Sequence, residues 1–140
     1  MSAFTKVWAF SQAVSEKQHN LSTDVLKIAL SNTAVNNQTA AQLSDVTQIA
    51  AGNGYNTDGN TVANSAGSST SGVYKLTGDD VDFVASGGDI APFRYVVIYN
   101  SSSTNNKLIG FWDYGSSVTV TDGNTFTVDM DQINGILTVT

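Results

Sequence analysis

The fold is decided by five closely spaced runs of β-type sequence: FRYVVIYN (93–100), KLIGFWDY (107–114), SVTVT (117–121), TFTVDM (125–130) and ILTVT (136–140). Ser, Asn and Gly residues separate these runs, as is usual for turns. Phe126, Val128 and Met130 alternate with polar residues, which predicts one buried and one wet face. Residues 93–99 are apolar on both faces apart from Arg94, which predicts a central strand covered on both sides. Together the runs predict an antiparallel β-sandwich.

The preceding residues add further strands and one helix. Strand-like runs are DVLKIALS (24–31), VYKLTG (73–78) and VDFVA (81–85). We expect a short helix over residues 11–19, with Ser11 as its N-cap and Asn20 as its stop. The sequence therefore predicts one domain over residues 1–140. Its fold class is all-β, a jelly-roll or immunoglobulin-like antiparallel sandwich of about 8–10 strands with one short N-terminal helix.

Three stretches fit less simply into this scheme. Residues 4–10 (FTKVWAF) suit either a strand or the lead-in to the helix. Residues 43–51 suit either a helical turn followed by a strand or one extended segment. Residues 61–72 begin as an edge strand and are expected to continue as a flexible Ser-rich loop.

Composition excludes several classes of partner. The 140 residues carry a net charge of −6, and only 13% of them are charged. Six Lys and Arg residues, dispersed along the chain, do not form a basic patch that could bind nucleic acid or an anionic membrane surface. The chain has no Cys, which removes disulfides, thiolate nucleophiles and Cys–zinc sites. No run resembles a signal peptide or a membrane span, so we expect synthesis in a cytoplasm, with any release by lysis.

Candidate chemical groups are few, and we predict no enzyme, no cofactor and no metal site. His19 is the one His, and a catalytic role would need a partner nucleophile or acid. A partly exposed His at a helix end is the alternative reading. Asp79, Asp80 and Asp82 form an acidic run, and residues 129–135 faintly resemble a calcium loop that lacks its third oxygen ligand and its terminal Glu. Exposed turn residues explain both patterns.

The Gly-rich and aromatic stretches can each be interpreted as a ligand site or as ordinary structure. Gly52 and Gly54, like Gly87 and Gly88, read as turns, because no helix and Lys follow them as in a phosphate cradle. The aromatic residues Phe111, Trp112 and Tyr114 could stack on a sugar or a base, or could form core and interface.

Several segments resemble a family of small bacteriophage and prophage virion proteins. The longest are HNLSTDVLKIALSNTA (19–34), IAAGNGY (49–55), IAPFRYVVIYN (90–100) and LIGFWDYGSSVTV (108–120); SGVYKL (71–76), FVASGG (83–88), NTFTVDM (124–130) and GILTVT (135–140) complete the set. The resemblance implies a virion structural protein, a β-sandwich present in many copies, with no catalytic residues. It favours a capsid decoration (cement) protein on the outside of the head, with a tail or fibre component as the alternative. The exact length of the Ser- and Asn-rich loop at residues 56–70 is not expected to be a family feature.

The expected partners are the major capsid protein and copies of the chain itself, as a homo-oligomer such as a trimer, without nucleic acid or membrane. The expected localisation is the capsid exterior of the virion, after synthesis in the host bacterial cytoplasm. We place the interface on residues 1–10, at Phe4, Val7, Trp8 and Phe10, and expect the domain to stay soluble without this segment. Trp8 could instead fill the protein's own core, since aromatic anchors occur in both settings. A glycan-binding module that uses Trp112, Tyr114 or residues 52–60 is the alternative from another functional class.

Overall fold

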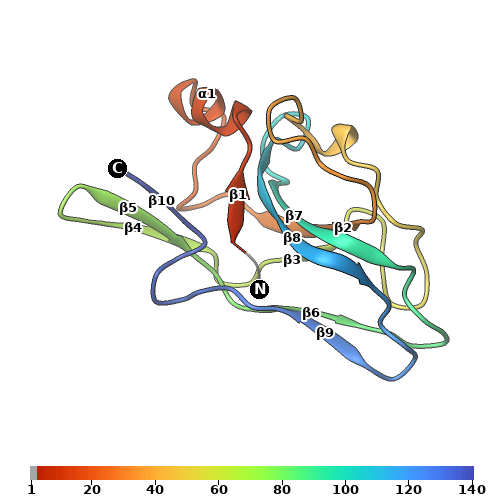
Figure 1. Cartoon of the computed structure of the whole chain (residues 1–140). Helices are drawn as coiled ribbons and strands as arrows, with labels where there is room; N and C mark the ends of the chain where they lie inside the picture. Colours follow the sequence, from red (N-terminus) through yellow and green to blue (C-terminus); the bar gives the residue numbers. More distant parts are fainter. Residues whose placement is uncertain (1–2) are drawn as a thin grey trace.

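A computed structural model describes residues 3–140 and contains ten strands, one α-helix and one short 3₁₀ helix within that range (Figure 1). The strands are β1 (Phe4–Lys6), β2 (Leu26–Ser31), β3 (Asn60–Thr61), β4 (Ala66–Thr70), β5 (Val73–Thr77), β6 (Val81–Val84), β7 (Phe93–Asn100), β8 (Leu108–Val118), β9 (Thr125–Val128) and β10 (Leu137–Val139). The helix α1 spans Ala9–Ser15, and the 3₁₀ helix spans Leu43–Asp45.

A five-stranded antiparallel sheet with the order β1-β8-β7-β2-β3 forms the centre of the molecule. Its middle strand, β7, pairs with β2 along six residues, from Leu26 opposite Asn100 to Ser31 opposite Tyr95. Every residue of β7 is buried except the half-buried Arg94. The prediction of a central strand covered on both sides is confirmed.

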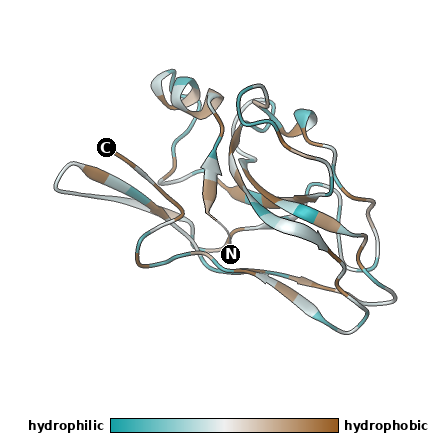
Figure 2. Cartoon of the chain, in the orientation of Figure 1, coloured by the Kyte–Doolittle hydropathy of each residue, from teal (hydrophilic) through white to brown (hydrophobic). Residues whose placement is uncertain are grey.

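The β6–β9 ribbon covers part of this sheet. Phe83 of β6 is fully buried and stacks on Tyr55, with 6.0 Å between ring centroids. Phe126 of β9 meets Phe93 of β7 edge-on at 4.9 Å. Val128 is buried while the Thr residues of β9 are exposed, as the alternation in the sequence predicts. The hydropathy of the residues along the ribbon can be followed in Figure 2. The predicted all-β, antiparallel, sandwich-like fold with one short helix is confirmed.

A third sheet, β10-β5-β4, extends away from the rest of the molecule (Figure 1) and is called here the projecting sheet. Its β4–β5 hairpin turns through Ser71 and Gly72, whose φ angles of 52° and 81° are both positive. Two positive φ values are required by the type I′ turn that joins twisted antiparallel strands. The buried Leu76 of β5 attaches the sheet to the common core.

Three local predictions were wrong, each for a physical reason. Residues 61–72 contain β4 rather than a flexible loop, because the hairpin turn and pairing with β5 order a polar run that has no hydrophobic alternation. Residues 117–121 are not a separate strand: β8 continues to Val118, and residues 114–117 have no partner in β7. Helix α1 occupies Ala9–Ser15 rather than residues 11–19.

The helix boundaries follow from backbone geometry rather than from the expected caps. The N-cap position is Trp8, which makes no side-chain capping bond, and Ser11 lies inside the helix. At the other end Lys17 adopts a positive φ of 65°. The N–H of Gln18 then donates to the Ala13 carbonyl and the N–H of Lys17 to the Val14 carbonyl, as in a Schellman-type ending.

Candidate functional site

The structure separates the four residues predicted to form an interface. Val7 is fully buried and Phe10 is 2% exposed, so both belong to the chain's own core. Phe4 is half-buried, and its ring meets Trp112 edge-on at 4.9 Å. Trp8 is 59% exposed, so the alternative in which it fills the core is wrong. Of the predicted interface, Trp8 and the outer part of Phe4 are available to a partner; Met1 and Ser2 lie outside the described residues.

Trp8 is held firmly although its side chain is exposed. Its backbone N–H donates to the Asn37 carbonyl at 2.8 Å, and the N–H of Val7 donates to the Ile109 carbonyl at 3.2 Å. The buried side chain of Val7, between β1 and Trp8, and that of Phe10 in α1 anchor the chain on both sides of it. An indole fixed by its backbone on both sides loses little further freedom on binding, which favours a role as a docking residue.

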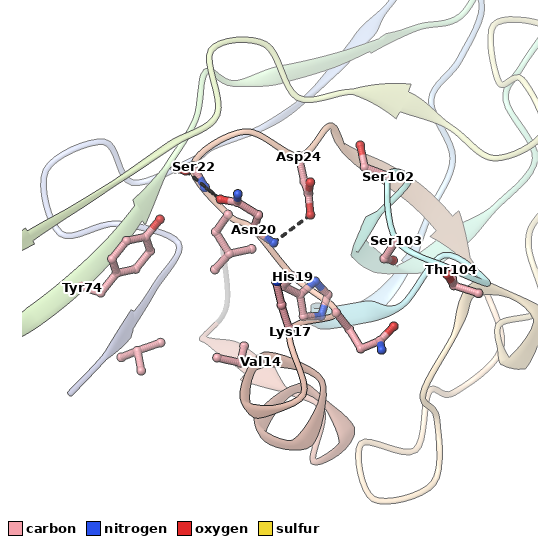
Figure 3. A pocket seen from close by; sticks show the side chains of 13 residues that line it. Val14, Lys17, His19, Asn20, Ser22, Asp24, Tyr74, Ser102, Ser103 and Thr104 are labelled. Carbon is pink, nitrogen blue, oxygen red and sulfur yellow. Dashed lines mark hydrogen bonds between the residues drawn. The ribbon is translucent and has the colours of Figure 1, made fainter.

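A cleft of about 740 Å³ lies at the other end of α1 (Figure 3). One wall is residues 17–24, which lead from α1 to β2, and a second is the loop at residues 102–104. The third is Tyr74 of β5 with its cross-strand neighbour Val139 of β10. The cleft therefore separates the projecting sheet from the helix.

His19 lines this cleft and is tied to the end of β7. Asn100 is fully buried, and its side-chain oxygen accepts the N–H of Ser102 at 2.9 Å. This fixes its amide nitrogen as the donor toward Asp24 Oδ2 at 2.6 Å and His19 Nδ1 at 3.0 Å. Nδ1 of His19 is therefore an acceptor, and the proton of the neutral ring lies on Nε2.

The environment of His19 favours the neutral ring. Burial lowers its pKa below the ordinary value; Asp24 opposes this shift and Lys107 adds to it. Nε2 is buried and has no hydrogen-bond partner within residues 3–140, and a buried donor without a partner is destabilising. The ring also packs on Phe10, with centroids 5.2 Å apart. His19 is half-buried, in keeping with the partly exposed His expected, but it lies beyond the end of α1 at Ser15 and packs against the helix.

The hydroxyl groups around the cleft are engaged in loop structure. Ser22 donates to the side-chain oxygen of Asn20 at 2.7 Å. Ser103 donates to the Asn100 carbonyl at 2.7 Å, and the hydroxyl of Ser102 accepts the N–H of Val25 at 2.9 Å. Ser103 and Thr104 line the same cleft as His19, but in the described part of the chain no hydrogen bond joins a Ser or Thr hydroxyl to the His19 ring, as a nucleophile and its base would require.

The acidic residues singled out in the sequence stabilise turns and strand pairs. Asp79 accepts from Asn64, Asp80 from the N–H of Met130, and Asp82 from Thr127. Asp131 accepts the N–H groups of Asn134 and Ile133, and these bonds, led by that of Asn134, hold the pKa of its carboxyl below the ordinary value. Within residues 3–140 no three His, Cys, Asp or Glu side chains are grouped so as to hold a metal ion.

The aromatic platform considered for a glycan is largely covered. Phe111 and Trp112 are 7% and 5% exposed. Tyr114 is 46% exposed, but its ring packs edge-on against Phe126 at 5.9 Å. Only Tyr114 could meet a sugar, so the structure removes Trp112 from that alternative.

The turn-rich loop at residues 52–60 is anchored by a buried network that the sequence did not reveal. Tyr55 is 1% exposed and donates to Gln48 Oε1 at 2.6 Å. The same oxygen accepts the N–H of Asp58 at 2.8 Å, and the Tyr99 hydroxyl donates to the Asp58 carbonyl at 2.5 Å. Burial, assisted by the Asp58 charge and opposed by the Leu30 N–H, raises the pKa of Tyr55 to about 12. The one sequence feature that could have indicated this buried network is the presence of an aromatic residue, Tyr55, inside a Gly- and Asn-rich run.

Comparisons with known proteins found no matching family model, no matching curated protein and no matching solved structure. The resemblance to virion proteins drawn from the sequence segments quoted above therefore stays a prediction. In the described part of the chain, no helix has the length and apolar character needed to cross a membrane.

Proposed function

We propose that this chain is a structural protein of a bacteriophage virion, bound as a decoration (cement) protein to the outside of the head. The sequence segments that resemble virion proteins support this role. The structural observation that carries it is Trp8, a large aromatic side chain that is 59% exposed on a backbone fixed at both sides. Rigid exposed aromatic residues are the usual anchors of protein interfaces.

The mechanism is adhesive. Trp8 enters a pocket on the major capsid protein, and the surrounding polar surface excludes water from the contact. Each Å² of apolar area buried there contributes about 25 cal/mol before the costs of association are subtracted. Copies of the chain arranged on the capsid exterior then bridge neighbouring coat subunits and resist their separation.

The composition suits this role. Only 13% of the residues are charged, so few charges need to be desolvated when a surface is covered. The net charge of −6 disfavours adhesion to the packaged genome. Synthesis takes place in the host bacterial cytoplasm, where the chain joins the assembling head.

The experiment uses particles of the phage or prophage that encodes the chain, produced with its gene deleted. Purified chain is added, the particles are pelleted, and the bound chain is measured. We expect wild-type protein to bind and Trp8→Ala to bind at least about 30-fold more weakly, as for an interface hot spot. Ile133→Ala is the matched control, because Ile133 is 80% exposed and far along the sequence from Trp8.

Two results would contradict the proposal: no binding of the wild-type chain, or equal binding of wild type and Trp8→Ala. Electron microscopy of gold-labelled chain distinguishes the head from a tail or fibre, and label confined to the tail would exclude the decoration role.

A further inference from the structure

The outer edge of the projecting sheet is open. β4 lies at one end of the order β10-β5-β4 and pairs only with β5. Ser68, Ser69 and Thr70 of this strand are exposed. An unpaired strand presents a row of backbone donors and acceptors and is a template for another strand.

The register identifies which backbone groups face outward. The two-residue turn is closed by Thr70 opposite Val73, a hydrogen-bonded pair. Hydrogen-bonded and non-bonded pairs alternate along an antiparallel ladder, so Ser68 also bonds to β5 while Ser69 and Gly67 do not. The N–H and C=O groups of Gly67 and Ser69 therefore point to the open edge. No bond from either group to another element is found in the described part of the chain.

β4 also lacks the features that normally protect an edge. Its sequence, AGSST, contains no charge and no Pro, whereas edge strands usually carry Lys, Pro or a bulge. At five residues it is the longest edge strand among those described. Of the others, β1 contains Lys6 and β6 contains Asp82, β3 and β10 have two and three residues, and β9, which is also uncharged, has four.

Charge makes this edge suited to a second copy of the chain. Lys75 is the one charged residue in the three strands of the projecting sheet, so all twelve acidic residues of the protein lie elsewhere. Two copies with net charge −6 repel one another. The approach of least repulsion brings the two projecting sheets together.

We propose that two copies of the chain pair through β4, antiparallel and about a two-fold axis. Gly67 of each copy lies opposite the partner's Ser69, and the exchange forms about four backbone hydrogen bonds. Ser68 lies on the axis, opposite its own equivalent. The contact is self-complementary, as two-fold interfaces must be. It extends the three-stranded sheets into one six-stranded sheet.

A single cysteine tests this register directly. The protein has no Cys, so Ser68→Cys introduces one thiol in each copy. Directly opposed residues of a non-bonded antiparallel pair have Cβ atoms about 4.5–5.5 Å apart, and modest adjustment brings them to the spacing of a disulfide. Under mild oxidation we expect rapid conversion of this variant to a covalent dimer. Ser116→Cys, at an exposed position on β8, is the matched control and should dimerise on the order of ten times more slowly.

A second variant tests the same contact without forming a covalent cross-link. Ser69→Pro removes an outward N–H and leaves the bonds to β5 intact, as an edge position tolerates. Sedimentation equilibrium of the full chain should give dimers for wild type and a dissociation constant at least about tenfold higher for Ser69→Pro. Wild type that stays monomeric at every concentration, equal oxidation of the two cysteine variants, or unchanged association of Ser69→Pro would each overturn the proposal. These tests use no virus particle, so their failure is distinct from failure of capsid binding.

Discussion

Two tryptophans in aromatic-rich segments have opposite environments. Trp8 is 59% exposed, whereas Trp112 is 5% exposed and packs on Phe4. Trp8→Ala should therefore change the free energy of unfolding by no more than about 0.5 kcal/mol. Trp112→Ala should lower it by about 3–5 kcal/mol, as for other buried aromatic truncations. Urea unfolding of both variants measures the difference; equal losses would mean that the side chains are not placed as described.

His19 makes stability depend on pH. Because its pKa in the folded protein is lowered from the ordinary 6.5, the unfolded chain binds the proton more readily. The contribution of His19 to stability is therefore complete above pH 6.5 and is lost as the pH falls through the folded-state pKa. Protonation also places a donor at Nδ1 against the Asn100 amide. Asp24, Lys107 and Lys17 are the charged groups around it.

We expect the free energy of unfolding of the wild type to fall between about pH 7 and pH 5, above the range in which most carboxylates titrate. His19→Gln should remove most of this slope, since the chain has one His. Urea denaturation at a series of pH values measures both proteins. A wild-type slope of zero, or the same slope in His19→Gln, would contradict the described environment.

The sequence predicted some residues well and others not at all. Parity along residues 125–130 placed Val128 and Met130 inside, because a strand has a strict two-residue period. The sequence pattern could not show that Trp8 is exposed and Trp112 is buried. Neither tryptophan lies in a run with a clear two-residue or helical period, so only tertiary packing decides which side chain is covered. Tyr55 is buried against Phe83 and bonded to Gln48, and no local pattern in the sequence connects these residues.

At the scale of elements, β1 is part of the sheet rather than a separable docking segment. Phe4 to Lys6 pair with β8, and a Cβ at Gly110 would overlap both the Phe4 ring and the Thr5 carbonyl. Val7 and Phe10 fill the core. On these contacts we expect residues 3–10 to be needed for a stable domain, in contrast to the solubility without residues 1–10 that the sequence suggested.

Deletion of residues 1–10 should lower the free energy of unfolding by at least about 4 kcal/mol, because it removes two core side chains and an edge strand. Aggregation or loss of the cooperative urea transition is the expected result. Trp8→Ala is the control that removes the proposed anchor alone. A truncated chain with wild-type stability would show that β1 is not integral to the fold.

Strand prediction succeeded where β-propensity coincided with a continuous apolar run, as in β7, or with a two-residue alternation, as in β6. It failed for β4, whose Ser and Thr residues give no period, and at the end of β8. There, Arg94 and Asp113 form an ion pair at 2.7 Å, and Asp113 also accepts the N–H of Gly115. This arrangement stabilises the irregular residues 114–117 within a longer strand, where Gly and Ser suggested a turn.

At the scale of the whole molecule, the two proposed contacts lie at two different places. Trp8 lies at the start of α1, and the β4 edge lies on the projecting sheet. The first is proposed to bind the coat protein and the second another copy of the chain. Salt should affect them differently: weaker repulsion between the acidic bodies should strengthen dimerisation as ionic strength rises. Sedimentation equilibrium at low and high salt measures this change, and weaker dimerisation in high salt would contradict it.

The central claim is that the chain is a structural component of the outside of a phage head. A particle reconstruction by electron cryomicroscopy, at a resolution that places side chains, tests it most directly. We predict density for this all-β fold in many copies on the capsid exterior, with Trp8 enclosed by the major capsid protein. Particles that lack the chain, or that carry it only on the tail, would contradict the claim.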